Sequence, residues 1–164
     1  MIRYDNWFFP TTQDLRFEHE TEWDKMRNFL GTSFFDDEQR MVDLIERFGK
    51  AKRLNKAADQ KLSRRTHADS IEEVEDMVST YRSAARRKGV PTQLATMFQN
   101  GDPLPMPIVM QRRSRGFIVG GNTRLNIAEI LGVTPDPQVV YVNLDLPEVA
   151  EMLDNYPLNR LRGM

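Results

Sequence analysis

Two adjacent glycines, Gly120 and Gly121, separate an apolar stretch from a helix-forming one, and this junction constrains the fold more than any other feature of the sequence. Phe117 to Val119 has the composition of a short strand. Asn122 to Leu131 carries apolar residues at helical spacing and is followed by Gly132, a typical helix terminator. Paired glycines let the backbone turn sharply and let a ligand approach the main chain. The junction therefore predicts a strand-turn-helix unit.

The predicted turn also has the chemistry of an anion site. The first N-H groups of a helix have no intrahelical acceptor and lie at the positive end of its dipole. Asn122 is a favourable N-cap, Thr123 adds a hydroxyl donor, and Arg124 adds a guanidinium that matches phosphate oxygens. We therefore expect a phosphate ligand to contact Gly120, Gly121, Asn122, Thr123 and Arg124. The alternative is an ordinary strand-to-helix turn with Asn122 as its cap and Arg124 on the surface.

The rest of the chain predicts an α/β (α+β) fold, a small mixed sheet flanked by helices. Residues 1–65 are assigned to a helical N-terminal extension and a basic linker, and residues 66–164 to a core domain. In the N-terminal half we expect a strand or docking segment at Trp7–Pro10 and helices at Glu20–Leu30 and at Met41–Phe48, the second capped by Asp36 or Asp37. Two more helices are expected at Ser70–Lys88, which begins with a Ser70/Glu73 capping box, and at Pro91–Phe98. They are followed by a hairpin of Pro105–Met110 with Phe117–Val119, a strand at Val139–Leu144 and a last helical turn after Pro147. Lys50–Arg65 is expected to extend the preceding helix or to form a linker.

Composition excludes several kinds of site. The chain has no cysteine and only two histidines, His19 and His67. Disulfides, cysteine nucleophiles and thiolate metal sites are therefore excluded, and we expect no metal bound by a histidine cluster. No apolar run approaches the ~20 residues of a membrane span, and Met1–Pro10 lacks the pattern of a signal peptide. We expect a soluble cytoplasmic protein that does not contact membranes.

The net charge of −1 conceals an uneven distribution. Residues 50–124 carry 15 basic and 7 acidic side chains, whereas acidic side chains outnumber basic ones on both sides. A basic middle region is typical of an anion-binding surface, although solvated helix faces give the same pattern.

The segment from Gly101 to Leu144 resembles the ParB/sulfiredoxin-like superfamily, and it looks most similar to stand-alone ParB-like proteins of tailed phages. The matching stretches are Gly101–Val109, Gly116–Leu125 around Gly-Gly-Asn-Thr-Arg, and Ile130–Gly132. The capped helix from Ser70 resembles the helix that precedes this core, so the resemblance covers about residues 69 to 145. It implies that Phe9–Leu15 supplies the first strand of the family, and that the cytoplasm is that of a phage host.

In that family the Gly-x-x-Arg turn binds nucleotide phosphates, so the resemblance implies a nucleoside di- or triphosphate with Mg²⁺ at Gly121–Arg124. CTP-binding partition proteins have a second arginine where this chain has Asn126, which argues against their clamp chemistry. Sulfiredoxins have their catalytic cysteine where this chain has Asn122, which excludes their activity. ParB-like serine kinases have a histidine pair in the turn, absent here, and use an N-terminal acid as a base.

The first functional hypothesis is a nucleotide hydrolase or phosphotransferase that acts at the turn. Such a reaction needs an acid to hold Mg²⁺ or to activate a hydroxyl. Asp102 is the nearest candidate in sequence, and Glu18, Glu20 and Glu22 are candidates if the N-terminal region folds over the turn. Each of these acids is more often an ordinary surface residue.

Two alternatives remain. In the first, the protein is a nucleic-acid-binding protein or a nuclease. Two groups of basic residues could contact a phosphate backbone: a stretch of Lys50, Lys52, Arg53, Lys56, Lys61, Arg64 and Arg65, and a hairpin tip of Arg112, Arg113 and Arg115 beside the turn. The pI of about 6.2 argues against a dedicated DNA-binding protein.

In the second alternative, the protein is a non-catalytic phage interaction module. It would dock a partner or a second copy of itself through the aromatic residues Trp7, Phe8, Phe9, Trp23, Phe34 and Phe35. At helical spacing such residues are more often core.

Overall fold

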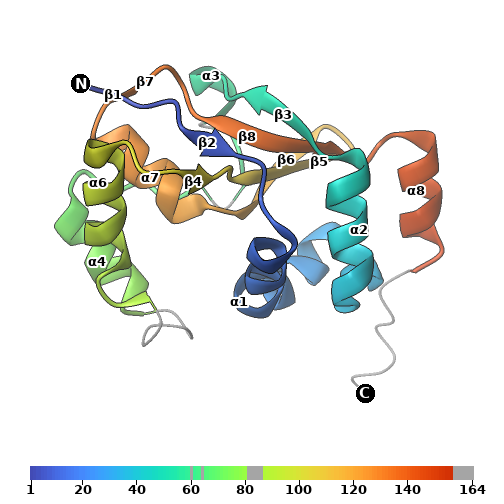
Figure 1. Ribbon diagram of the computed structural model, residues 1–164. Coiled ribbons are helices and arrows are strands. Elements are labelled where there is room, and N and C mark those ends of the chain that lie inside the picture. Colours follow the sequence, from blue (N-terminus) through green and yellow to red (C-terminus); the bar gives the residue numbers. More distant parts are fainter. Residues whose placement is uncertain (60, 64, 81–86, 157–164) are drawn as a thin grey trace.

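The computed structural model describes residues 1–59, 61–63, 65–80 and 87–156, with the backbone alone for 21–29 and 59. Its centre is a four-stranded sheet in the order β3-β8-β5-β6 (Figure 1), formed by Lys50–Arg53, Gln138–Asn143, Ile108–Arg112 and Arg115–Gly120. The outer pairs are antiparallel and the central pair, β5 with β8, is parallel. The predicted mixed sheet and the predicted hairpin are therefore confirmed.

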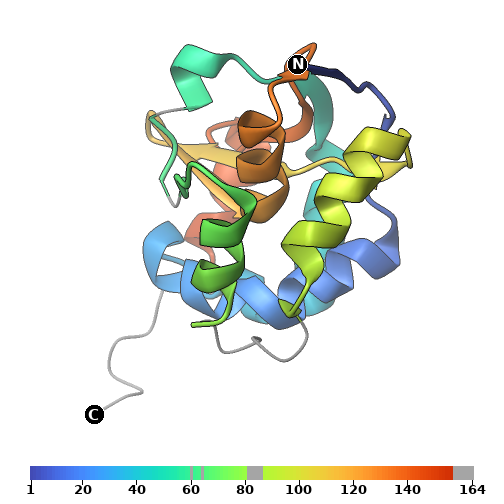
Figure 2. The same cartoon turned by 90° about the vertical axis from the view of Figure 1, so that its left-hand side faces the viewer.

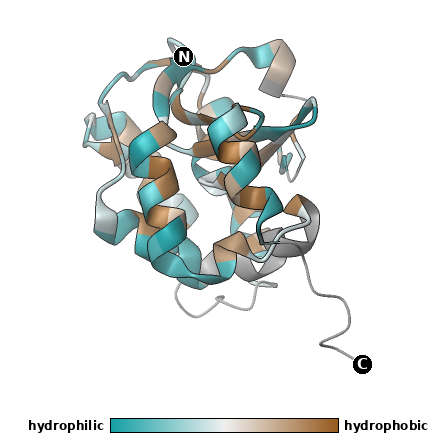
Figure 3. Cartoon of the chain, turned by 90° about the vertical axis from the view of Figure 1, so that its right-hand side faces the viewer, coloured by the Kyte–Doolittle hydropathy of each residue, from teal (hydrophilic) through white to brown (hydrophobic). Residues whose placement is uncertain are grey.

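Helices α1 (Thr12–Leu30), α2 (Glu38–Phe48) and α8 (Pro147–Asp154) lie on one side of this sheet, below it in Figure 1. Met41 and Ile45 of α2 are fully buried in one apolar cluster with Met110 and Val140 of the sheet. Figure 3 views the end where α2 and α8 lie side by side, and each helix carries hydrophobic and hydrophilic residues on different sides. Asp37 is the N-cap of α2, since its carboxylate accepts hydrogen bonds from the backbone N-H groups of Gln39 and Arg40.

Helices α4 (Ile71–Val78), α6 (Val90–Asn100) and α7 (Asn122–Ile130) form the opposite end of the molecule (Figure 2). Ser70 caps α4 by accepting a hydrogen bond from the N-H of Glu73 at 3.2 Å, and the Glu73 carboxylate accepts from the N-H of Asp69 at 2.9 Å. The forward bond of the predicted capping box is therefore confirmed, whereas the Glu73 carboxylate bonds to Asp69 in place of the N-cap residue Ser70. The helix expected to reach Lys88 ends at Val78, and residues 81–86 lie outside the described part of the chain.

Residues 1–65 supply strands as well as helices. Strands β1 (Ile2–Arg3) and β2 (Trp7–Phe8) pair in parallel with β7 (Val133–Thr134) and β4 (Leu104–Pro105). The basic stretch is strand β3 followed by helix α3 (Lys56–Asp59), so the expectation of a linker or a longer helix was wrong there. The expectation of a strand at Phe9–Leu15 was also wrong, because helix α1 begins at Thr12.

An aromatic cluster fastens the N-terminus to α6. The rings of Tyr4, Trp7 and Phe98 pack edge to face, with centroids 4.9 to 5.6 Å apart. Burial raises the pKa of Tyr4 to about 12, and its hydroxyl donates to the carbonyl of Asp102 at 2.6 Å. Of the aromatic residues considered for docking, Trp7, Phe34 and Phe35 are buried core residues, whereas Phe9 is 37% exposed and the side chain of Trp23 lies outside the description.

Candidate functional site

A cleft of 480 Å³ opens at the N-terminal end of α7. Its walls come from helix α1, from the β6–α7 turn, from residues 65–67 and from helices α4 and α6. All five predicted ligand-binding residues line it, namely Gly120, Gly121, Asn122, Thr123 and Arg124. The strand-to-helix turn therefore faces a cavity large enough for a small ligand.

Gly121 is required by its surroundings, and Gly120 lies close to the Glu18 side chain. Gly121 has φ +84, and a Cβ there would lie 2.7 Å from the Cβ of Pro107 and 2.7 Å from a guanidinium nitrogen of Arg124. A Cβ on Gly120 would lie 2.9 Å from the carboxyl carbon of Glu18. Any side chain at either position would fill the space in which Glu18 and Arg124 meet.

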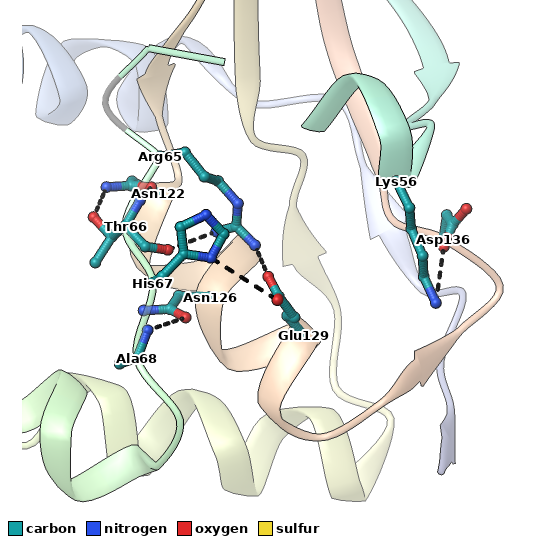
Figure 4. Close-up of polar contacts among 9 residues, drawn as sticks. All are labelled: Lys56, Arg65, Thr66, His67, Ala68, Asn122, Asn126, Glu129 and Asp136. Atoms are coloured by element: carbon teal, nitrogen blue, oxygen red, sulfur yellow. Dashed lines mark hydrogen bonds and ion pairs between the residues drawn. The ribbon is translucent and has the colours of Figure 1, made fainter. Parts of the chain in front are cut away.

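Asn122 has a different role from the predicted one. Gly121 is the N-cap of α7, and Asn122 is the first helical residue, so the prediction of Asn122 as the cap was wrong. The Asn122 side chain instead accepts a hydrogen bond from the N-H of Thr66 at 3.0 Å and donates to the Thr66 hydroxyl. One turn later, Asn126 accepts from the N-H of Ala68 at 3.3 Å. Both amides thus hold residues 65–68 along α7 (Figure 4).

This attachment places Arg65 at the cleft. Its side chain is 2% exposed, and its guanidinium contacts the carboxylate of Glu129, two turns into α7. His67 Nδ1 lies 4.0 Å from the same carboxylate. Figure 4 shows the side chains of Arg65 and His67 both directed at the carboxylate of Glu129. Because Ser63 also pairs with Phe117 of β6, the chain is fixed on both sides of Arg65.

Arg124 is held from the opposite side by helix α1. A guanidinium nitrogen of Arg124 lies 3.5 Å from the Glu18 carboxylate, and the two side chains are only 15% and 11% exposed. Within the described part of the chain, Nε of Arg124 has no hydrogen-bond acceptor. The guanidinium is therefore fixed in place with part of its donor capacity unused.

The cleft has one cationic side and one apolar side. Arg65, Arg87 and Arg124 line it, and among its described lining residues Glu18 is the one acid. Met77 and Val78 of α4, with Val90 and Leu94 of α6, form the apolar wall. Glu75 joins the two helices, since its carboxylate accepts from the N-H of Gly89 and from the N-H and hydroxyl of Thr92. This arrangement can hold a ligand with an anionic group and an apolar or aromatic group.

Two of the candidate catalytic acids, Asp102 and Glu20, lie elsewhere. Asp102 follows α6 and does not line the cleft, and its carbonyl accepts the Tyr4 hydroxyl. Glu20 is exposed on α1 and does not line the cleft either. Glu18, an alternative from the same helix, is the acid at the turn. Glu22 lies among residues whose side chains are outside the description.

The arginine-rich hairpin tip is remote from the turn. Strand β6 begins at Arg115 and ends at Gly120, so about 17 Å of extended chain separates them. The expectation that the tip lies beside the turn was therefore wrong. Arg112 is engaged structurally, because its guanidinium donates to the carbonyl of Leu30 and to Asp154 at 3.3 Å. Arg113 and Arg115 are exposed and line a separate hollow of 290 Å³.

Fold and cleft together define an α/β protein with a cationic cavity at a strand-to-helix turn. No family model matches the chain, and no curated protein or solved structure matches it at a significant level. The ParB/sulfiredoxin-like resemblance therefore stays a prediction. Among the described helices, none combines the length and the apolar character that a bilayer span requires. The described residues include no group of three His, Asp or Glu side chains placed to bind a metal ion.

Proposed function

We propose that this protein binds a nucleotide in the cleft, with the phosphates at the Gly120–Arg124 turn. The observation that supports this most is the convergence of a helix N-terminus and the guanidinium of Arg124 in one cleft, whose lining also includes Arg65 from a distant part of the chain. Helix N-H groups and guanidinium groups are the donors that proteins use most for phosphate oxygens. In this proposal they act together on one anion.

The apolar wall favours a nucleotide over free phosphate. Val90, Leu94, Met77 and Val78 lie in the same cleft as the arginines, and they offer a surface for a base or a sugar. Nucleotide pockets need both kinds of contact, because phosphates bind to N-H donors whereas bases bind to apolar surface. The proposed ligand is therefore a nucleoside di- or triphosphate.

The reaction proposed for this site is nucleotide hydrolysis or phosphoryl transfer. Phosphoryl transfer depends on charge neutralisation and on an acid that positions Mg²⁺ or the attacking hydroxyl. Glu18 takes that place in the proposal instead of Asp102 or Glu20, because it is the carboxylate beside Arg124. Mg²⁺ usually binds through the phosphates and only one or two carboxylates, so Glu18 is a sufficient protein contribution.

Titration with labelled ATP, CTP and ADP, each with and without Mg²⁺, tests binding. Arg124→Ala should weaken the affinity at least about tenfold, since a hydrogen bond to a charged group is worth about 1.5–3 kcal/mol. Arg47→Ala is the matched control, because Arg47 is 68% exposed on α2 and its substitution removes the same charge. If none of the three nucleotides bound, or if both variants lost affinity equally, the proposal would fail.

Turnover is tested separately with Glu18→Gln. Phosphate release or transfer should fall by about a hundredfold or more, as expected on loss of a general base. Nucleotide affinity measured without Mg²⁺ should be kept or increased, because an uncharged amide competes less for Arg124. Unchanged turnover would remove Glu18 from the reaction and leave the binding proposal intact.

A further inference from the structure

The side of the sheet that faces away from α1, α2 and α8 carries a second hollow. This groove of 410 Å³ is lined by residues of β3, β8, β5 and β6, of the short helix α3 and of the tip of the β5–β6 hairpin. Residues 61–63 form one of its walls. The same residues lead into the 65–68 segment, so the groove and the cleft lie on different sides of one stretch of chain.

Strand register sets the chemistry of this groove. Lys50 pairs with Tyr141 and Lys52 with Val139, while Val109 pairs with Tyr141 and Gln111 with Asn143. Alternate residues of a strand point to the same side, so the two lysines share a face with Tyr141 and Gln111. Ile118 and Val109 of this face are covered by Leu125 and Leu62, whereas Tyr141 is only partly buried. The open part of the face is therefore aromatic and basic.

The groove has an excess of positive charge. Lys52, Arg53, Lys61 and Arg115 line it, and none of its described lining residues is acidic. Arg53 is engaged with Asp5 at 3.0 Å, which leaves the exposed lysines Lys52 and Lys61 as its main charges. The Lys52 ammonium lies 4.9 Å from the centroid of the Tyr141 ring. A cation over an aromatic face is an arrangement that a stacked base and its phosphate can replace.

The hairpin tip at the end of the groove keeps a costly conformation. Arg113 and Ser114 have φ of 52 and 64, and neither is glycine. Two-residue hairpin loops of this kind normally contain Asn-Gly, because most side chains disfavour positive φ. Strained backbone that persists is a reason to look for function. Here it places Ser114 in the lining of the groove, whereas Arg113 lines the separate hollow of 290 Å³.

We propose that this groove binds single-stranded nucleic acid. Lys52 and Lys61 contact successive phosphates, a base stacks on Tyr141, and the Gln111 amide contacts the edge of that base. Single strands suit this site because their bases are free to stack on an aromatic ring, whereas a duplex presents only its backbone. The site is independent of the nucleotide cleft and does not use Arg124.

Fluorescence anisotropy with labelled oligothymidine and oligouridine of about 12 nucleotides, and with a duplex of equal length, tests this inference over a series of salt concentrations. Both single strands should bind more tightly than the duplex. Comparison of oligothymidine with oligouridine shows whether DNA or RNA is preferred. The Lys52→Ala/Lys61→Ala variant should lower the slope of log affinity against log salt by about 1.4, because each phosphate contact on a single strand contributes roughly 0.7.

Matched variants separate this site from general charge effects. Arg16→Ala/Arg47→Ala removes two charges from exposed positions on α1 and α2, across the sheet, and should leave oligonucleotide affinity unchanged. Tyr141→Ala should weaken binding about tenfold, whereas Tyr141→Phe keeps the ring and should keep the affinity. Arg124→Ala should have no effect. Absence of binding to either single strand, an equal loss in the matched variant, or a Tyr141→Ala variant that binds like the wild type would each overturn the inference.

Discussion

The cleft and the groove are both lined by basic side chains, but they present their charges in opposite ways. In the cleft, Arg65 is 2% exposed and Arg124 is 15% exposed, and each is paired with a carboxylate. In the groove, Lys52 and Lys61 are exposed, and the described lining contains no acid. Paired, buried arginines have a fixed geometry and suit one ligand of defined shape, whereas exposed lysines suit a flexible chain of phosphates. Salt should therefore weaken binding in the groove far more than in the cleft.

The largest expected effect comes from replacing Gly121 in the turn that forms the cleft. Gly121→Ala should lower the free energy of unfolding by about 3 kcal/mol, since it combines a left-handed backbone with a clash at Pro107. Chemical denaturation measures this loss. Gly101→Ala is the control, because Gly101 has φ +73 with nothing within 4 Å of its added Cβ, and it should cost about 1 kcal/mol. Equal losses would show that the close approach at the turn does not matter.

Replacing Asn122 tests whether the 65–68 segment belongs to the cleft alone. Asn122→Ala removes both contacts to Thr66 and should cost about 1–2 kcal/mol of stability. Nucleotide affinity should fall with it, because Arg65 loses its attachment, while oligonucleotide affinity should not change. Asn100→Ala, at an exposed position on α6, is the control and should alter neither. A loss of oligonucleotide binding in Asn122→Ala would mean that the two sites are coupled.

The smallest effect concerns the apolar wall of the cleft. Burial by itself would raise the pKa of Glu75, but hydrogen bonds from Thr92 and Gly89 outweigh it and lower the pKa below its ordinary value of 4.5. A lowered folded-state pKa contributes stability that is present above the ordinary value and is lost as the pH falls through the lowered one. Glu75→Gln should therefore cost about 1 kcal/mol at neutral pH, and the difference from the wild type should shrink below pH 4.5. Denaturation at several pH values, with exposed Glu72→Gln as the control, measures this; a difference that did not depend on pH would contradict it.

Local signals predicted the parts of the cleft that depend on neighbouring residues. The Gly120–Gly121 turn, the hairpin before it and the helix after it follow from glycine conformation and apolar spacing, and the structure has them in place. The role of Asn122 was misread because Gly121, in the left-handed region, takes the cap position one residue earlier. The sequence alone does not distinguish an asparagine at the first helical position from an asparagine at the N-cap.

Residues brought from afar were the ones that could not be predicted. All four residues of strand β3, Lys50–Arg53, are exposed, so it has no alternation of apolar and polar residues to reveal it. Arg65 was grouped with the basic stretch, and its place at the cleft depends on the pairing of Ser63 with β6. Glu18 was one of several acids in α1, and only the packing of that helix against Gly120 distinguishes it. No local pattern encodes any of these contacts.

The Glu18–Arg124 pair has a consequence for what can enter the cleft. In the free protein the carboxylate already occupies the position beside the guanidinium, at 3.5 Å. A chloride ion carries the same single charge as the Glu18 carboxylate. To replace that carboxylate, chloride would have to lose bound water, whereas the carboxylate is part of the chain and is already partly desolvated. A polyphosphate brings several charges at once and can reach the helix N-H groups as well. We therefore expect the Glu18–Arg124 pair to favour polyphosphates over monovalent anions such as chloride.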